Sequence, residues 1–407
     1  MLGGALTNRV AVDKALTIQS VNGPLVTVIK GNSPMSPSAV RCIYLTNDAV
    51  LVGFTLTNGA TLVSAGIDSS GGGALCSISS VLSNCVITGN SCGLNGGGVA
   101  GGVLYNCILS GNYSYRAFGG GAYSSTLNGC QITGNWANNG GGADSSILND
   151  CLVISNSAST LGGGTHNCSL VGSTLVGNQA NGGQGASGGT LANCISYYNY
   201  GFSQANYSAA TLNYCCTTPL PAGGAGNITN APLFVNIAGG DFRLQNNSPC
   251  INAGKNSYVT TSTDLGGNSR IRGGTVDMGA YEFQSPGSLL SHAWAQQYGL
   301  ATDGSADHAD ADQDGMDNWQ EWVAGTNPTN SLSVLKVLSL SNSSPGVKLT
   351  WQSVTNRSYY IQRATNLAMD ISFSTIYSNV PGLAGSTSVI DTNAPPCASG
   401  FYRVGVQ

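Results

Sequence analysis

The sequence predicts an all-β protein: a right-handed parallel β-helix (a solenoid), followed by a short helix-loop-helix segment and a small β-sandwich. Three observations support this prediction. A leucine recurs every 21 to 23 residues, runs of glycine recur with the same spacing, and alternation of apolar and polar residues returns near the C-terminus. A fixed period of this length is typical of a solenoid, in which each coil packs against its neighbours.

The repeated leucines open successive coils: Leu82, Leu104, Leu127, Leu148, Leu170, Leu191 and Leu212. Three residues after each leucine stands a small side chain: Cys85, Cys107, Cys130, Cys151, Ser173, Cys194 or Cys215. An apolar residue follows two positions later, as in Ile87 and Leu109. Residues at i and i+2 share one face of a strand, so we expect this face to point inward.

A bend must separate each leucine from its cysteine, because the two positions have opposite parity. Asparagine tolerates the left-handed backbone that such a bend needs, and asparagines lie in this gap: Asn84, Asn106, Asn128, Asn149 and Asn193. After the second strand comes a Gly-Asn pair, as at Gly89-Asn90, and then a glycine run such as Gly96 to Gly98. Three short strands per coil, stacked about 4.8 Å apart, fit this pattern.

The 13 cysteines allow two interpretations. Neighbouring coils bring equivalent cysteines within the Cα distance of a disulfide, but parallel side chains on adjacent coils need an awkward dihedral angle. We therefore predict a buried ladder of thiols that pack as small apolar groups. Ser173 fits this packing role better than obligatory pairing, and no Cys-His spacing indicates zinc.

Two resemblances follow from these residues. The Leu-x-Asn-Cys-x-Ile coils resemble the bacterial right-handed β-helix proteins of the pectate-lyase-like superfamily. The segments 248–254, 264–270 and 276–283, which read SPCINAG, DLGGNSR and VDMGAYEF, are similar to the choice-of-anchor Q domain of bacterial surface proteins. This family implies export and surface display without a settled activity. We expect the β-helix over residues 1–283, with its C-terminal cap at about 240–283.

Composition limits the classes of function. Only 8% of the residues are charged and the net charge is −4, so a nucleic acid finds no basic surface to bind. The sequence contains no apolar window long enough to predict a transmembrane segment. The start, Met1 to Arg9, lacks the features of an export signal, although the chain otherwise suggests an extracellular or cell-surface protein. We therefore treat Met1 as a candidate truncation point.

Catalysis would need charged groups, which are sparse in the β-helix. Between Cys42 and Cys250 the only charged residues are Asp48, Asp68, Arg116, Asp144, Asp150, Asp241 and Arg243, with His166 as the one histidine. Arg116, Asp144 and His166 lie one coil apart and could cluster on one face, but isolated solvent-facing residues are the simpler interpretation. Further charges gather where the repeat stops: Asp264, Arg270, Asp277 and Glu282. We expect an ion-paired lid that closes the end of the β-helix, and a carbohydrate or metal site is the alternative.

Residues 310–321, DADQDGMDNWQE, match the EF-hand calcium loop at every defining position. The expected Ca²⁺ ligands are the side chains of Asp310, Asp312, Asp314, Asn318 (directly or through water) and Glu321, with the backbone carbonyl of Met316. Leu289 to Leu300 predicts an entering helix and Trp319 to Ala324 an exiting one, within a linker of residues 284–330. An unoccupied acidic linker is the alternative. Similar loops occur in dockerins, but a single loop indicates a structural clip.

Residues 331–407 predict a small β-sandwich, because alternating segments such as Val347 to Trp351 are separated by turn signals such as Pro381-Gly382. It loosely resembles a fibronectin type III domain. Trp351, Tyr359 and Tyr360 could form a platform for sugar stacking, but core packing is the expected role.

Two hypotheses of function remain. The first is a non-catalytic extracellular or cell-surface protein, an adhesin or matrix-binding stalk whose β-helix meets polysaccharide or another cell-surface ligand. The second is a polysaccharide lyase or glycoside hydrolase, which rests on analogy of fold alone. An exposed groove with two carboxylates would favour the enzyme, and smooth faces of Asn, Ser and Thr would favour binding.

Overall fold

A computed structural model of the chain describes residues 6–63, 66–202, 205–343, 345–365, 373–394 and 400–407, so Met1 lies outside the described residues. The contacts divide the chain into two units, Met1–Pro286 and Gly287–Gln407. The first unit is a parallel β-helix and the second holds two short helices and two antiparallel sheets. The predicted all-β class and β-helix are confirmed.

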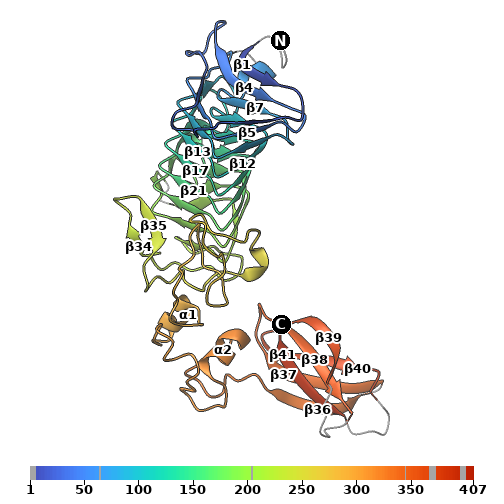
Figure 1. Ribbon diagram of the computed structural model, residues 1–407. Coiled ribbons are helices and arrows are strands. Elements are labelled where there is room, and N and C mark those ends of the chain that lie inside the picture. The colour runs from blue at the N-terminus through green and yellow to red at the C-terminus, as the bar shows by residue number, and fades with distance from the viewer. Residues whose placement is uncertain (1–5, 64–65, 203–204, 344, 366–372, 395–399) are drawn as a thin grey trace. The chain divides into compact units, whose positions relative to one another are not determined.

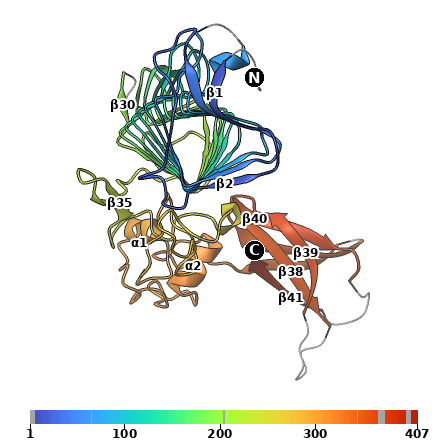
Figure 2. The same cartoon turned by 45° about the horizontal axis from the view of Figure 1, so that its top comes forward.

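Four parallel sheets run along the β-helix (Figures 1 and 2). Sheet A holds β1 (Thr7–Val12), β4 (Val40–Leu45), β7 (Ala74–Cys76), β11 (Val99–Ala100), β15 (Ala122–Tyr123), β19 (Ala143–Asp144), β23 (Thr165–His166), β27 (Ala186–Ser187) and β31 (Tyr207–Ser208). Sheet B holds β2 (Thr17–Gln19), β5 (Val50–Val52), β8 (Val81–Ser83), β12 (Val103–Tyr105), β16 (Thr126–Asn128), β20 (Ile147–Asn149), β24 (Ser169–Val171), β28 (Thr190–Ala192) and β32 (Thr211–Asn213).

Sheet C holds β3 (Val28–Lys30), β6 (Thr55–Thr57), β9 (Val86–Thr88), β13 (Ile108–Ser110), β17 (Gln131–Thr133), β21 (Leu152–Ile154), β25 (Thr174–Val176), β29 (Ile195–Tyr197) and β33 (Cys216–Thr217). The shorter sheet D holds β10 (Ser91–Cys92), β14 (Tyr113–Ser114), β18 (Trp136–Asn139), β22 (Ser157–Leu161), β26 (Gln179–Ala180) and β30 (Tyr200–Gly201). Short 3₁₀ helices lie at Ile67–Ser69 and Asn256–Tyr258.

The predicted leucines form one continuous row on sheet B. Leu104 pairs with Leu82 on one side and Leu127 on the other, and both the leucine row and the apolar row of sheet C are buried. The glycine runs precede sheet A, where the coils pack backbone against backbone. A Cβ at Gly97 would lie 2.5 Å from the carbonyl oxygen of Gly120, so a larger residue would push two coils apart.

The bend between sheets B and C lies immediately before each cysteine. Asn84, Asn106 and Asn193 occupy it with φ of 50°, 51° and 51°, as predicted. Asn128 and Asn149 were assigned to the wrong position: they end strands β16 and β20. The next residues, Gly129 and Asp150, adopt the left-handed backbone with φ of 59° and 49°. Two asparagine-rich positions stand side by side in these coils, and the pattern alone does not tell them apart.

A buried ladder of asparagines follows sheet C, at the second predicted turn: Asn90, Asn112, Asn135, Asn156, Asn178 and Asn199. Asn206, just before β31, continues the ladder by accepting from Asn199. Nδ2 of Asn135 donates to the carbonyl oxygen of Leu109 at 2.9 Å and to Oδ1 of Asn156 at 2.9 Å. Its own Oδ1 accepts from the backbone N–H and Nδ2 of Asn112, both at 2.9 Å. Each amide therefore satisfies polar groups on its own and the neighbouring coils, which makes it an interior structural element.

We expect Asn135→Ala to destabilise the first unit by about 3 kcal/mol, because several buried donors and acceptors lose their partner at once and each costs about 1–3 kcal/mol. Asn138 is the matched control, since it lies in the same coil but its amide makes only exposed contacts. Its Nδ2 donates to the carbonyl oxygen of Arg116 at 2.8 Å, and its Oδ1 accepts from the hydroxyl of Ser159 at 3.2 Å. Urea unfolding measures both variants. An equal loss for the two variants would contradict the structural role of the ladder.

The cysteines are free and buried throughout the described residues, as predicted. Sγ of Cys107 donates to the carbonyl oxygen of Tyr105 at 3.3 Å, and Sγ of Cys130 accepts from the N–H of Cys107 at 3.4 Å. Ser173 makes the same contacts, donating to the carbonyl of Val171 and accepting from the N–H of Cys151, both at 3.1 Å. The position three residues after each repeated leucine therefore favours a small side chain that can bridge two coils.

Burial raises the pKa of Cys92 and of Cys168 to about 12. A thiol reagent that needs thiolate should therefore leave the described cysteines of the native first unit unmodified at pH 8 and label them only after denaturation. Mass spectrometry of labelled peptides measures this. Rapid labelling of the native coils would contradict the buried ladder.

Residues 217–286 pack on the outer face of sheet C. They include an antiparallel hairpin of β34 (Phe234–Asn236) and β35 (Asp241–Leu244). A second apolar core contains Phe234 and Phe242 from the hairpin together with Leu152 and Ile195 from sheet C. The prediction of a lid at the end of the β-helix is therefore wrong in its location: the segment covers a flank, because the outward residues of these sheet C strands are apolar and need a cover.

The second unit holds helices α1 (His292–Gln297) and α2 (Asn318–Ala324) and a two-sheet sandwich. One sheet holds β36 (Val337–Ser343), β37 (Gly346–Ser353) and β40 (Gly385–Asp391). The other holds β38 (Ser358–Ala364), β39 (Ser374–Pro381) and β41 (Phe401–Val406). Trp351 and Tyr359 lie in its core, which matches the packing role expected for them. Tyr360 is half-buried.

Candidate metal centre

The loop of residues 310–321 folds around the carboxylate of Asp310. Its Oδ1 accepts from the backbone N–H of Gln313 at 2.8 Å, and its Oδ2 accepts from that of Gly315 at 3.0 Å. Gly315 has φ of 96°, in the region that favours glycine. These bonds close the loop locally and bring the later acidic residues back toward its start.

Helix α2 places the last acidic residue of the loop. Asp317 caps the helix: its side chain accepts from the N–H of Gln320, whose side chain returns to the N–H of Asp317. Such a capping box fixes the first turn, and Glu321 follows on the buried side of the helix. Gly325 ends the helix with φ of 76°, as predicted.

Three carboxylates meet in the loop. Those of Asp310, Asp312 and Asp314 each offer an oxygen within 4.8 Å of the others, the one such group of three among the described residues. Glu321 is fully buried. Burial, followed by the charges of Asp312 and Asp314, raises the pKa of Glu321 to about 7. Negative charge is thus concentrated where a cation would relieve it.

Buried oxygens without hydrogen-bond partners support this interpretation. They include both carboxylate oxygens of Asp312 and of Glu321, Oδ2 of Asp314 and Oδ1 of Asn318. Buried polar atoms normally have partners, so such a concentration in one loop is unusual. Carboxylate and amide oxygens are hard ligands that suit Ca²⁺ and Mg²⁺. The residues present therefore fit a divalent cation.

The helices flanking the loop differ from the expected pair. The helix predicted for Leu289 to Leu300 is shorter, because α1 ends at Gln297 and turns fill residues 298–309. Asp307 in this stretch holds the start of the unit: its carboxylate accepts from Oγ of Ser288 at 2.6 Å and the N–H of Leu289 at 2.8 Å. Only the exiting helix directly flanks the acidic loop.

Hydrogen bonds join the loop and helix α2 to the sandwich. The side chain of Arg357 donates to the carbonyl oxygens of Val323 at 2.8 Å and Trp322 at 3.0 Å, at the end of α2. The N–H of Leu335 lies 3.4 Å from the sulfur of Met316. The loop and the end of α2 are therefore in direct contact with the sandwich.

On the β-helix, the structure brings together two of three predicted residues. Nδ1 of His166 lies 2.6 Å from Oδ2 of buried Asp144, on neighbouring strands β23 and β19. Arg116 lies elsewhere, with its guanidinium over the ring of Tyr115 at 5.4 Å. The expectation of isolated residues is therefore wrong for Asp144 and His166.

The charges at 264–282 form a buried network. Arg270 donates to Oδ1 of Asp150 at 2.9 Å and to Oε2 of Glu282 at 3.0 Å. Asp277 accepts from the N–H groups of Asn252 and Phe283 at 2.7 and 2.6 Å, and the N–H of Glu282 donates to Asp264 at 3.0 Å. This network ties the flanking segment to a bend of the β-helix, as expected of an ion-paired cover.

Comparisons with known proteins assign the chain to no family. The chain is similar to a solved structure described as the crystal structure of pectate lyase Pel9A, with 17% sequence identity, 67% of this chain and 87% of that chain covered, and a TM-score of 0.33. No family model matches the chain, and no curated protein sequence matches it. Neither α-helix in the described residues is long and apolar enough to cross a membrane.

Proposed function

We propose that this chain is a non-catalytic β-helix protein of the cell surface or extracellular space that binds polysaccharide, with a Ca²⁺ ion stabilising its second unit. The observation that carries this proposal is the division of chemistry between the units. In the β-helix, Asp144 is engaged with His166 and Asp150 with Arg270, whereas the second unit holds converging carboxylates with buried oxygens that lack partners.

For the ion, we propose the ligand set Asp310, Asp312, Asp314, Met316 (carbonyl), Asn318 and Glu321. Bound Ca²⁺ would neutralise the repelling carboxylates and supply partners for the buried oxygens. Glu321 would act from the helix and the aspartates from the loop, so binding would fix α2 against the loop. A single extracellular site of this kind binds with a Kd of about 10⁻⁴ to 10⁻³ M.

For the β-helix, uncharged polar surface favours binding over catalysis. Glycoside hydrolysis uses two carboxyl groups placed around the scissile bond, and Asp144, Asp150 and Asp241 instead pair with His166, Arg270 and Arg243. The resemblance of 248–283 to the choice-of-anchor Q domain supports surface display. The alternative, a lyase or hydrolase, requires an exposed acidic or basic pair.

One experiment separates these two functions. The full chain is incubated with polygalacturonate, xylan, mannan and a soluble cellulose derivative, with and without Ca²⁺, while affinity electrophoresis reports binding and assays for reducing ends and unsaturated products report cleavage. We expect retardation by at least one polymer and no cleavage. New chain ends would establish the enzyme, and the absence of both signals would refute polysaccharide binding.

A further inference from the structure

From β14 to β30, sheet D carries two outward rows of side chains with aromatic rings at both ends; Ser91 of β10 precedes the first row. The first row follows the strand register through Tyr113, Trp136, Ser157, Gln179 and Tyr200. Two positions further along each coil, the second row runs through Tyr115, Asn138, Ser159, Asn181 and Phe202. From β14 to β30 the rows span four coil steps, roughly 19 Å at about 4.8 Å per step.

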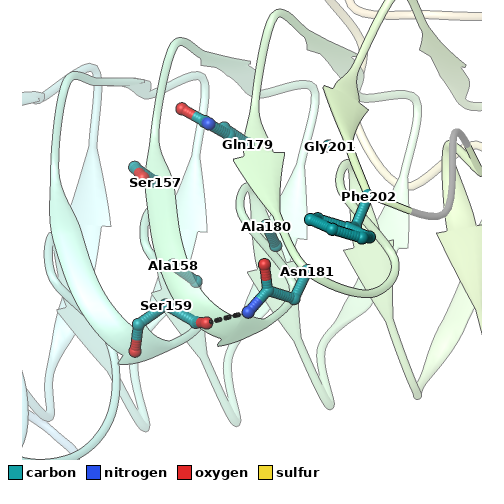
Figure 3. A pocket seen from close by; sticks show the side chains of 8 residues that line it. All are labelled: Ser157, Ala158, Ser159, Gln179, Ala180, Asn181, Gly201 and Phe202. Carbon is teal, nitrogen blue, oxygen red and sulfur yellow. Dashed lines mark hydrogen bonds between the residues drawn. The ribbon is translucent and has the colours of Figure 1, made fainter.

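The surface between the rows is hollowed. Its residues are small and buried: Ser114, Ala137, Ala158 and Ala180, with Gly201 at the end. A pocket of about 300 Å³ opens there, lined by Ser157, Ala158, Ser159, Gln179, Ala180, Asn181, Gly201 and Phe202 (Figure 3). This volume lies at the lower end of the range for small-molecule sites.

The rings at the two ends are placed differently. Tyr113 and Trp136 stack with centroids 4.8 Å apart and an interplanar angle of 15°. At the far end, Tyr200 is 55% exposed and Phe202 94% exposed. Exposed aromatic rings that lie together are common in binding sites, where they stack on a partner. Aromatic rings therefore lie at both ends of the polar part of the two rows.

The polar side chains between the rings are uncharged and face the solvent. Among the eight lining residues, Figure 3 shows one hydrogen bond, from Nδ2 of Asn181 to the carbonyl oxygen of Ser159 at 2.7 Å. That bond fixes the amide and leaves its Oδ1 available as an acceptor, while the hydroxyl of Ser157 and the amide of Gln179 offer both donors and acceptors. The two rows contain no Asp, Glu, Lys or Arg.

We propose that this groove of sheet D is the glycan-binding site and that it takes an uncharged oligosaccharide lying along the β-helix axis. A sugar ring presents an apolar C–H face and a rim of hydroxyl groups, which suits aromatic rings together with amide and hydroxyl side chains. An anionic glycan would meet a cation only at the Tyr115 end, where Arg116 lies over the ring, and none in the two rows from Trp136 to Phe202. This inference rests on the proposed polysaccharide binding and names its site and ligand class.

The test is calorimetric titration of the full chain with hexasaccharides from xylan, mannan and cellulose, and with hexagalacturonate as the anionic probe. The variants are Phe202→Ala and Gln179→Ala, whose side chains are exposed and whose loss should leave the coil folded. Tyr105→Ala is the matched control, since Tyr105 is a 45% exposed tyrosine on sheet B. Circular dichroism checks the fold of each variant.

We expect at least one uncharged hexasaccharide to bind, with affinity falling about tenfold in each groove variant and unchanged in Tyr105→Ala. Binding that survives in both groove variants would refute this groove while preserving glycan binding elsewhere. A preference for hexagalacturonate would overturn the uncharged ligand class. If no glycan binds in either the polymer or the hexasaccharide experiment, the proposed function fails together with the site.

Discussion

Replacing Arg270 with methionine should destabilise the first unit by about 3–5 kcal/mol, the usual cost of removing one partner from a buried ion pair. Its guanidinium is the cation that contacts Asp150 and Glu282, and all three side chains are buried. Methionine keeps much of the volume but none of the charge. Guanidinium unfolding monitored by far-UV circular dichroism measures the loss.

The control for this prediction is Arg243→Met, which removes an exposed arginine from its pair with Asp241 and should change stability little. The cost of Arg270→Met should also grow with pH. Burial raises the pKa of Asp277 and of Glu282, and loss of the cation raises them further. A carboxyl group whose pKa is raised in the folded state stabilises that state at any pH below its ordinary pKa of about 4. This stabilisation is lost as the pH rises through the raised pKa of the folded state. A smaller cost at pH 8 than at pH 5 would contradict the network.

Saturation with Ca²⁺ should stabilise the second unit by about 2.7 kcal/mol when the free ion is at 100 times its Kd. The unfolded loop cannot gather the carboxylates of Asp310, Asp312 and Asp314, so the ion binds the folded state alone. Thermal unfolding in chelator and in excess Ca²⁺ measures the shift. The transition of the β-helix should not respond, because its described residues contain no group of three metal-ligating side chains close enough to share an ion.

Glu321→Gln is the sharpest variant for this second effect. It keeps the size of a fully buried side chain and removes the charge that a divalent ion requires. Asp303→Asn is the matched control, because the Asp303 carboxylate lies in the same unit but is committed to Ser305, accepting from its N–H at 3.0 Å and its Oγ at 2.6 Å. Calcium-dependent stabilisation should disappear in the first variant and persist in the second. Equal stabilisation of both variants would exclude Glu321 from the site.

The repeat in the sequence predicted the β-helix well, because each coil contributes the same inward positions. Leu104 and Leu127 predict the buried face of sheet B, and the structure pairs them directly. The misassigned bend at Asn128 shows the limit of this reasoning. Asparagine serves equally at a strand end and in a left-handed turn, and Gly129 takes the turn where both types are adjacent.

The sequence also predicted which residues of the acidic loop converge, since the spacing of Asp310, Asp312 and Asp314 is local. Interactions between distant segments were harder to predict. The pair of Arg270 with Asp150 spans 120 positions, and the groove of sheet D depends on how successive coils align Trp136 with Ser157. A single coil shows neither arrangement. The one available signal was the recurrence of aromatic residues at the same coil position.

Calorimetric titration of Ca²⁺ into the chelator-treated full chain measures the metal centre most directly. We expect saturable binding of one ion per chain, with a Kd of about 10⁻⁴ to 10⁻³ M. The double variant Asp310→Ala, Glu321→Ala should show no such heat. Absence of binding by the parent chain, or binding that survives unchanged in the double variant, would contradict a calcium site in this loop.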